Sequence, residues 1–219
     1  MSSSNYLYDS VFGHTIDSKK TFLINQNGEM SYANFHELVN QLANTLKVSG
    51  LKVGDRVAVQ AEKSNVQIAL YVATIKSGGV YLPLNTDYTA NELEYFLKDS
   101  DASIVIIDSK NEDSIKKTII NESVKILTLN QNETGSLTSL SNKQEKVFDT
   151  VPRNPEDLAA ILYTSGTTGR SKGAQLSHNN LLSNTKVLKD FWKFNENDVL
   201  LHMLPIYHTH GLFVACNLL

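Results

Sequence analysis

Two short stretches carry residue types that could do chemistry, and the longer one is rich in glycine and hydroxyl groups. It runs from Tyr163 to Gly173 as Tyr-Thr-Ser-Gly-Thr-Thr-Gly-Arg-Ser-Lys-Gly. Gly166 and Gly169 allow positive φ and a close approach of the backbone to a ligand. Successive N–H groups in such a turn form a concavity that binds anions, and Lys172 adds a compact positive charge. The pattern predicts a loop that binds phosphate groups.

The spacing of this loop excludes the common nucleotide-binding motifs. The P-loop pattern G-x-x-x-x-G-K-[ST] places the lysine directly after the second glycine and a hydroxyl after the lysine. Here Lys172 lies three residues beyond Gly169, and Gly173 occupies the place of the Mg²⁺-binding hydroxyl. A P-loop kinase or NTPase is therefore excluded, and the dinucleotide pattern G-x-G-x-x-G is absent. The alternative interpretation is a plain surface hairpin between two strands.

The second stretch follows the apolar run 199–204, which predicts a strand that Pro205 closes. Tyr207, His208, Thr209 and His210 come next. Ligands of open α/β sheets bind outside the carboxyl ends of the strands, so we expect this stretch and the loop to share one cleft. Packing or an ordinary polar contact is the alternative for the two histidines. A zinc site using His202, His208, His210 or Cys216 lacks any recognised ligand spacing.

The remaining pattern alternates strands with amphipathic helices, which predicts an α/β fold with largely parallel sheets flanked by helices. Strands are expected at 57–59, 80–84, 104–107, 126–129, 158–162 and 174–176, besides a hairpin around Asn27-Gly28. Ser31 and Ser177 are expected to cap helices, and Ser64 with Gln67 and Thr89 with Glu92 to form capping boxes. The helix after Ser177 should bury Leu181, Leu182, Leu188 and Trp192. Residues of about 130–156 are polar and predict a long surface connection within one domain.

Composition restricts the partners and the compartment. The chain has 219 residues and a net charge of −3 without a lysine- or arginine-rich run, so no nucleic-acid surface is expected. The apolar stretches are too short for a membrane span, and Met1–Asn5 lacks the features of a signal peptide. Cys216 is the only cysteine, which excludes an intrachain disulfide. These features predict a soluble cytoplasmic protein.

The last nine residues, 211–219, are apolar and lack a helix stop signal. Chains usually end in exposed polar residues. We therefore expect a cut through a packed element, which would leave apolar side chains without partners. They are Leu212, Phe213, Val214, Leu218 and Leu219.

The stretch 163–173 resembles the phosphate loop of the adenylate-forming superfamily, which includes acyl-CoA synthetases, luciferases and amino-acid-activating domains. Pro205-Ile206-Tyr207-His208 resembles the aromatic motif that follows that loop in the superfamily. The strings 81–89, 169–174 and 204–212 are together similar to the malonate-activating branch of the acyl-CoA synthetases. Ser171 stands where most relatives have proline, and that branch shares the serine.

The resemblance implies a two-step reaction with ATP, Mg²⁺ and coenzyme A. A small carboxylate such as malonate would form an acyl-adenylate with release of pyrophosphate, and coenzyme A would then form the thioester. Lys172 and His208 would be catalytic, and His208 and His210 would line the acyl pocket; no metal ligand is expected within this chain. The residues implied to bind the ATP phosphates are Thr164, Ser165, Gly166, Thr167, Thr168, Gly169, Arg170, Ser171 and Lys172.

The resemblance also implies that the chain is incomplete. Residues 1–219 would be the amino-terminal part of the AMP-binding large domain, and the carboxy-terminal small domain would be absent. Such a chain alone is expected to be inactive. The alternative is a truncated non-catalytic protein that binds a nucleotide or another partner, and the oligomeric state cannot be read from the sequence.

Overall fold

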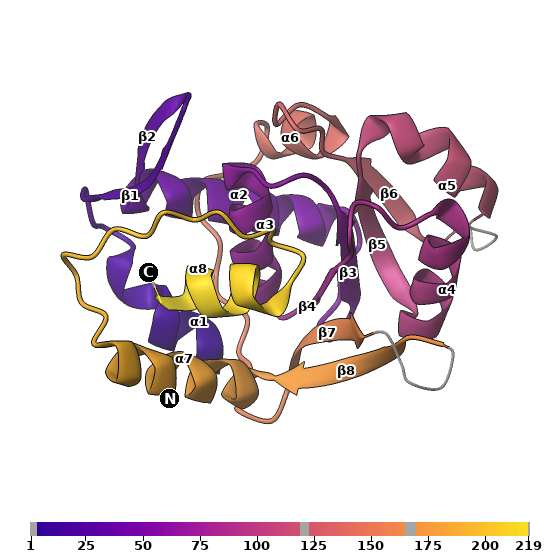
Figure 1. The fold of residues 1–219 in the computed structure, drawn as a ribbon. Coiled ribbons are helices and arrows are strands. Elements are labelled where there is room, and N and C mark those ends of the chain that lie inside the picture. The colour runs from indigo at the N-terminus through magenta and orange to yellow at the C-terminus, as the bar shows by residue number, and fades with distance from the viewer. Residues whose placement is uncertain (1–3, 119–122, 165–169, 219) are drawn as a thin grey trace.

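The computed structural model describes residues 4–118, 123–164 and 170–218 (Figure 1). In chain order the helices are α1 (Tyr6–Val11), α2 (Tyr32–Val48), α3 (Asn65–Lys76), α4 (Ala90–Ser100), α5 (Glu112–Thr118), α6 (Ser136–Ser141), α7 (His178–Trp192) and α8 (Ala215–Leu218). The strands are β1 (Thr21–Asn25), β2 (Gly28–Ser31), β3 (Arg56–Gln60), β4 (Val80–Pro83), β5 (Ala102–Ile107), β6 (Lys125–Thr128), β7 (Leu158–Thr164) and β8 (Lys172–Ser177). Short 3₁₀ turns cover Gly13–Thr15 and Ser109–Asn111, and His210–Val214 is a π-helical turn.

A six-stranded sheet in the order β6-β5-β3-β4-β7-β8 forms the centre of the molecule. The neighbours from β6 to β7 run parallel, and β8 pairs antiparallel with β7 at the edge. The predicted α/β fold with a largely parallel sheet is therefore confirmed. The separate hairpin of β1 and β2, which turns at Asn27-Gly28, is confirmed as well.

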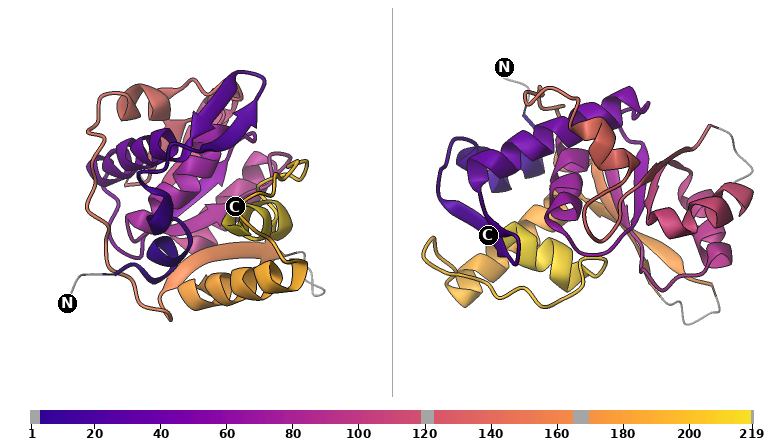
Figure 2. Two further views of the ribbon diagram at one scale, coloured as in Figure 1. Left: turned by 90° about the vertical axis from the view of Figure 1, so that its left-hand side faces the viewer. Right: turned by 90° about the horizontal axis from the view of Figure 1, so that it is seen from above.

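The two faces of the sheet bury different apolar clusters. In β3, Val57 and Val59 join the cluster on the side of α2 and α3, whereas Ala58 joins the cluster on the side of α4 and α5. This follows from the alternation of side chains along a strand. Figures 1 and 2 show the sheet between these two helix pairs. The sheet thereby places the carboxyl ends of its parallel strands along one edge.

Helix α3 is buried on every side, and its amino terminus departs from the prediction. The Ser64 side chain accepts a hydrogen bond from the Gln67 backbone N–H at 3.1 Å, as expected. The Gln67 side chain does not complete the capping box, and its amide atoms are buried without a hydrogen-bond partner among the described residues. Glu133 takes that place, because its Oε1 accepts from the backbone N–H groups of Asn65 at 2.8 Å and Val66 at 3.3 Å. The box of Thr89 and Glu92 at α4 is confirmed.

The polar connection of residues 130–156 is more structured than predicted. It contains α6, whose Leu137 is fully buried. Asn44 of α2 also donates to the carbonyl oxygens of Glu145 and Val147 at 2.9 Å each. The connection is thus fastened along α2.

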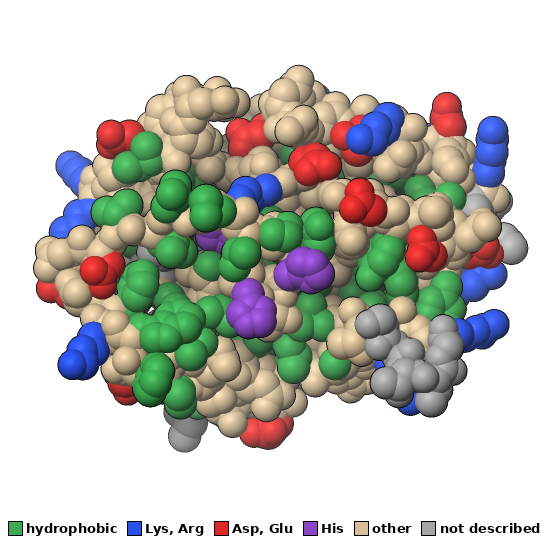
Figure 3. Space-filling view, in the orientation of Figure 1, with side chains coloured by type: hydrophobic (Ala, Val, Ile, Leu, Met, Phe, Trp, Pro, Cys, Tyr) green, Lys and Arg blue, Asp and Glu red, His purple; other side chains and the backbone are tan. Residues whose placement is uncertain are grey.

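The predicted strand at 199–204 is wrong. Residues 193–209 form no strand, and Val199, Leu201 and Met203 are 85, 80 and 78% exposed. Figure 3 shows hydrophobic side chains gathered on this side of the molecule. Ser177 caps α7 as predicted, and Leu181 and Leu182 are buried, but Trp192 is 52% exposed.

The end of the chain also differs from the prediction. Leu212 and Phe213 are buried, and the ring of Phe213 packs edge-on against Tyr71 at 5.4 Å between centroids. The expectation that these two residues lack partners is wrong, because α7 and the core around Tyr71 cover them. Of the helices in the described part of the chain, none is long and apolar enough to cross a membrane.

Candidate active site

The predicted phosphate loop connects β7 and β8, so it spans the turn of an antiparallel hairpin. Thr164, the last residue of β7, lies directly opposite Lys172, the first residue of β8. Thr164, Arg170 and Lys172 are exposed at this end of the hairpin. Five predicted phosphate-binding residues lie outside the described residues. They are Ser165, Gly166, Thr167, Thr168 and Gly169.

The local sequence explains why the hairpin forms here. The apolar residues Ala159, Ala160 and Ile161 bury β7 between the helix layers, and β7 pairs with β4 on its other side. β8 is an edge strand with a more polar sequence, and its first residue carries the cation. Two cations and a hydroxyl at the exposed end can receive a polyanion without the cost of burying an unpaired charge. The hairpin geometry and the phosphate-binding interpretation are compatible.

Helix α4 supports this hairpin through side chains that the sequence motifs do not include. Tyr163 Oη donates to Asp99 Oδ2 at 2.6 Å, and Tyr95 Oη donates to the Ser171 carbonyl oxygen at 2.8 Å. Burial raises the pKa of Tyr163, and the hydrogen bond to Asp99 raises it further. The Tyr163 hydroxyl therefore remains a donor at neutral pH. The capping box fixes where α4 begins, but no signal in the sequence shows that α4 lies beside the hairpin.

The second predicted stretch is a turn that leads into α8. His208 and His210 are exposed. The centroids of the Tyr207 and His208 rings lie 4.7 Å apart. Gly211 allows a close backbone approach, because a Cβ there would lie 2.1 Å from the Pro205 carbonyl oxygen. The turn therefore requires glycine at this position.

The preceding segment is attached by its buried Ile206, which lies in the core, and by polar contacts of Lys63 and His202. The Lys63 ammonium group donates to the carbonyl oxygens of His202 at 3.0 Å and Leu204 at 3.1 Å. The His202 ring nitrogen Nε2 lies 2.6 Å from the Gly211 carbonyl oxygen and donates to it. Sequence reasoning missed Lys63, since its partners are backbone atoms more than one hundred residues away.

Among the described residues, no hydrogen bond, ion pair or ring contact joins the two predicted stretches. The structure pairs Thr164 with Lys172 and brings Arg170 and Ser171 to α4. Neither His208 nor His210 has a hydrogen bond to these residues among the described contacts. Histidine side chains lie at the surface of the face drawn in Figure 3. The shared cleft stays a prediction.

Cysteine and histidine do not assemble into a metal site. Among the described residues, no group of three or more histidine, cysteine, aspartate or glutamate side chains could hold a metal ion. Cys216 is buried, and burial raises the pKa of its thiol to about 12. The Cys216 sulfur lies 4.0 Å from His202 Nε2, which already bonds the Gly211 carbonyl oxygen. A protonated buried thiol is neither a nucleophile nor a zinc ligand.

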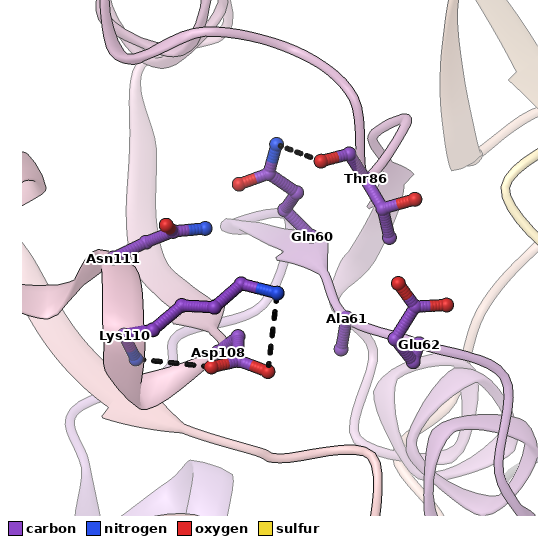
Figure 4. Close-up of a pocket in the computed structure, with 7 residues that line it drawn as sticks. All are labelled: Gln60, Ala61, Glu62, Thr86, Asp108, Lys110 and Asn111. Atoms are coloured by element: carbon purple, nitrogen blue, oxygen red, sulfur yellow. Dashed lines mark hydrogen bonds and ion pairs between the residues drawn. The ribbon is translucent and has the colours of Figure 1, made fainter.

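A small polar cavity lies elsewhere, at the carboxyl ends of β3 and β5, where the strand order reverses (Figure 4). Gln60 Nε2 donates to the carbonyl oxygens of Asn85 and Tyr88, and this fixes the side-chain amide. Its buried Oε1 has no hydrogen-bond partner among the described residues. The cavity volume is about 10 Å³, which is room for about one water molecule. None of the predicted site residues lines it.

The fold, together with the two predicted stretches, is that of the adenylate-forming enzymes. Comparison with protein families gives the same class. The family model described as AMP-binding enzyme matches residues 15–219. The chain therefore belongs to the AMP-binding enzyme family.

The relatives include ligases of short dicarboxylic acids. The structure of ATP-bound MatB from Rhodopseudomonas palustris superposes with a TM-score of 0.94 at 48% identity, covering 98% of this chain and 43% of that chain. An oxalate–CoA ligase from Arabidopsis thaliana is 31% identical over 85% of this chain and 37% of its own length. A mitochondrial malonate–CoA ligase from Mus musculus is 32% identical over 87% of this chain and 33% of its own length. The chain spans less than half the length of these relatives.

Proposed function

We propose that this chain supplies the phosphate-binding part of an ATP-dependent acid–thiol ligase. Residues 1–219 would be the amino-terminal part of the AMP-binding large domain of that ligase. The observation that carries the proposal is the pair of exposed cations, Arg170 and Lys172, at one end of the β7–β8 hairpin. Support comes from family membership and from the ATP-bound relative with the same fold. A cytoplasmic location stays a prediction.

In the proposed reaction, a carboxylate oxygen attacks the α-phosphorus of ATP and pyrophosphate leaves. Coenzyme A then attacks the acyl carbon of the adenylate, which releases AMP and forms the thioester. The first step brings an anion to a polyanion, so positive charge must be concentrated near the departing phosphates. Lys172, with Thr164 opposite it, meets this requirement. Mg²⁺ and coenzyme A belong to the proposal, and we assign neither of them a ligand among the described residues.

The proposed acid is a short dicarboxylate, with malonate as the first candidate. The names of the two relatives, oxalate–CoA ligase and malonate–CoA ligase, support this class. Exposed His208 and His210 would give the acyl pocket a polar wall. A site built to pair polar groups strongly rejects a ligand that lacks them. We expect kcat/KM to rank malonate above acetate and octanoate, and a preference for octanoate would contradict the substrate class.

Substitution of Lys172 tests the reaction itself. In a full-length protein that carries this chain, Lys172→Ala should lower malonate-dependent pyrophosphate release by about 10²–10³-fold, the usual cost of losing one such donor. Lys186→Ala is the matched control, because Lys186 is also exposed but lies on α7. Wild-type turnover in Lys172→Ala would remove Lys172 from the mechanism.

A second candidate is a non-catalytic protein that binds a nucleotide, which the exposed cations Arg170 and Lys172 would also serve. The two candidates differ in whether ATP is cleaved in the presence of the carboxylic acid substrate. Binding of ATP without malonate-dependent pyrophosphate release would favour the second candidate, and malonate-dependent release favours the ligase.

A further inference from the structure

Helix α4 contacts both strands of the phosphate-binding hairpin through two side chains on one face. Tyr95 and Asp99 lie four residues apart, which places them one turn from each other on the same side of the helix. Asp99 Oδ2 accepts from the Tyr163 hydroxyl at the end of β7. Tyr95 Oη donates to the carbonyl oxygen of Ser171, just before β8. One helix face therefore sets the separation of the two strand ends.

The same tyrosine also orients a cation. The guanidinium carbon of Arg170 lies 5.8 Å from the centre of the Tyr95 ring, within the range of a cation–π interaction. Tyr95 thus fixes two consecutive residues, Arg170 by its ring face and Ser171 by its hydroxyl. Lys172 follows directly, so its backbone position is set as well.

The base of this arrangement is rigid. Thr89 and Glu92 cap the start of α4, and its Phe96 is buried in the cluster below the sheet. The Phe96 ring packs against the Tyr163 ring at 4.5 Å between centroids. The helix, β7 and the start of β8 are therefore one packed unit.

We propose that Tyr95 and Asp99 are positioning residues for polyphosphate binding, which act by holding Arg170 and Lys172 together at the end of the hairpin. This inference rests on the proposed function and adds two residues outside its motifs. A site whose cations are held in place before the ligand arrives loses less conformational entropy on binding. Tyr95 and Asp99 need not touch the phosphates.

Binding of inorganic triphosphate to the 219-residue chain, followed by calorimetry, tests the inference. Tyr95→Phe keeps the ring and removes only the hydroxyl, and we expect roughly three- to tenfold weaker binding, the range of one lost hydrogen bond. Tyr95→Leu should weaken binding further, because the ring face is lost too. Asp99→Ala should resemble Tyr95→Phe, and Asp99→Asn should restore most of the affinity, because an amide oxygen still accepts from Tyr163.

Lys98→Gln is the control, since Lys98 belongs to α4 but pairs with Glu94 away from the hairpin. Its triphosphate affinity should equal that of the wild type. The thermal transition of each variant separates loss of fold from loss of affinity, and a purely structural role would lower the transition while the folded variant bound normally. That result, or unchanged binding in Tyr95→Phe and Asp99→Ala, would overturn the positioning role and leave the proposed function standing. Wild-type binding that does not depend on Lys172 would overturn the proposed function itself.

Discussion

The β7–β8 hairpin and the segment 193–210 carry the two sets of predicted site residues, and the chain holds them in different ways. The hairpin is paired strand to strand, joined to β4 and braced by Tyr95 and Asp99 of α4. The segment has no strand pairing and is attached through Lys63 and His202. Its Val199, Leu201 and Met203 are exposed, whereas Ile206 is buried in the core.

This difference separates two parts of the proposed function. The cations of the proposed phosphate site are positioned by contacts within this chain. The histidines of the proposed acyl pocket stand on a segment in which Val199, Leu201 and Met203 are exposed and Ile206 is buried in the core. We therefore expect binding of polyphosphate and selection of the acid to depend on different parts of a whole enzyme.

The largest expected effect comes from equivalent truncations in the two regions. Ile161→Ala removes a buried side chain of β7 and should lower the free energy of unfolding by about 2–5 kcal/mol. Leu201→Ala removes a similar volume from a side chain that is 80% exposed and should change it by no more than about 0.5 kcal/mol. Urea unfolding of both variants checks this, and equal losses would mean that Leu201 is packed in solution.

A smaller effect concerns pH and a histidine beside the hairpin. His178 follows β8 and is fully buried, and burial followed by the charge of Arg153 lowers its pKa to about 4, with Asp157 acting in the opposite sense. The unfolded chain takes up this proton near pH 6.5, so stability is complete above pH 6.5 and falls as the pH drops to about 4. Between pH 4 and 6.5, one such histidine should change the free energy of unfolding by about 1.4 kcal/mol per pH unit.

Buried His36, whose pKa is also lowered to about 4 by its burial and then by Lys76, adds a second contribution. Between pH 4 and 6.5, the free energy of unfolding of His178→Gln should therefore change with pH about half as steeply as the two histidines together predict for the wild type. Denaturant unfolding at several pH values measures it. A slope equal to that of the wild type would show that His178 is protonated in the folded protein.

The smallest expected effect is local. Lys63→Met removes the donor to the carbonyl oxygens of His202 and Leu204, and should loosen 199–210 while changing global stability by less than about 1 kcal/mol, since Lys63 is exposed. Chymotrypsin should then cleave after Leu201 or Met203 faster than in the wild type. Lys186→Met is the control, and equal cleavage of the two variants would show that Lys63 does not hold the segment.

Two apolar runs of similar composition show where sequence reasoning succeeds and where it fails. Residues 104–107 and 199–204 both predict strands. The first forms β5 between β3 and β6, with alternate side chains buried on the two faces of the sheet. The second has no neighbouring strand to bond with among the described residues. A strand needs a partner for its N–H and C=O groups, and the sequence of the strand alone does not say whether one is present.

Long-range contacts also limit what could be predicted of the site. The motif at 163–173 predicts that Thr164, Arg170 and Lys172 bind phosphate, and this prediction needs only local residue types and spacing. The two hydrogen bonds from α4 span long stretches of the chain. Asp99 and Tyr163 are 64 positions apart, and Tyr95 and Ser171 are 76 positions apart. Likewise, Glu133 caps α3 in place of the expected Gln67 across 68 positions. Local patterns fix the phase of a helix, but the neighbour it meets depends on the order of the strands.

Amide hydrogen exchange on the 219-residue chain tests the contrast between the two regions most directly. We predict protection of roughly 10³-fold or more for Ile161, Leu162 and Tyr163, because opening the hairpin requires breaking its pairing within the core. The amides of 199–203 should exchange within about tenfold of an unstructured peptide. Comparable protection of both regions would contradict the account, because it would mean that residues 199–203 find hydrogen-bond partners without any further chain.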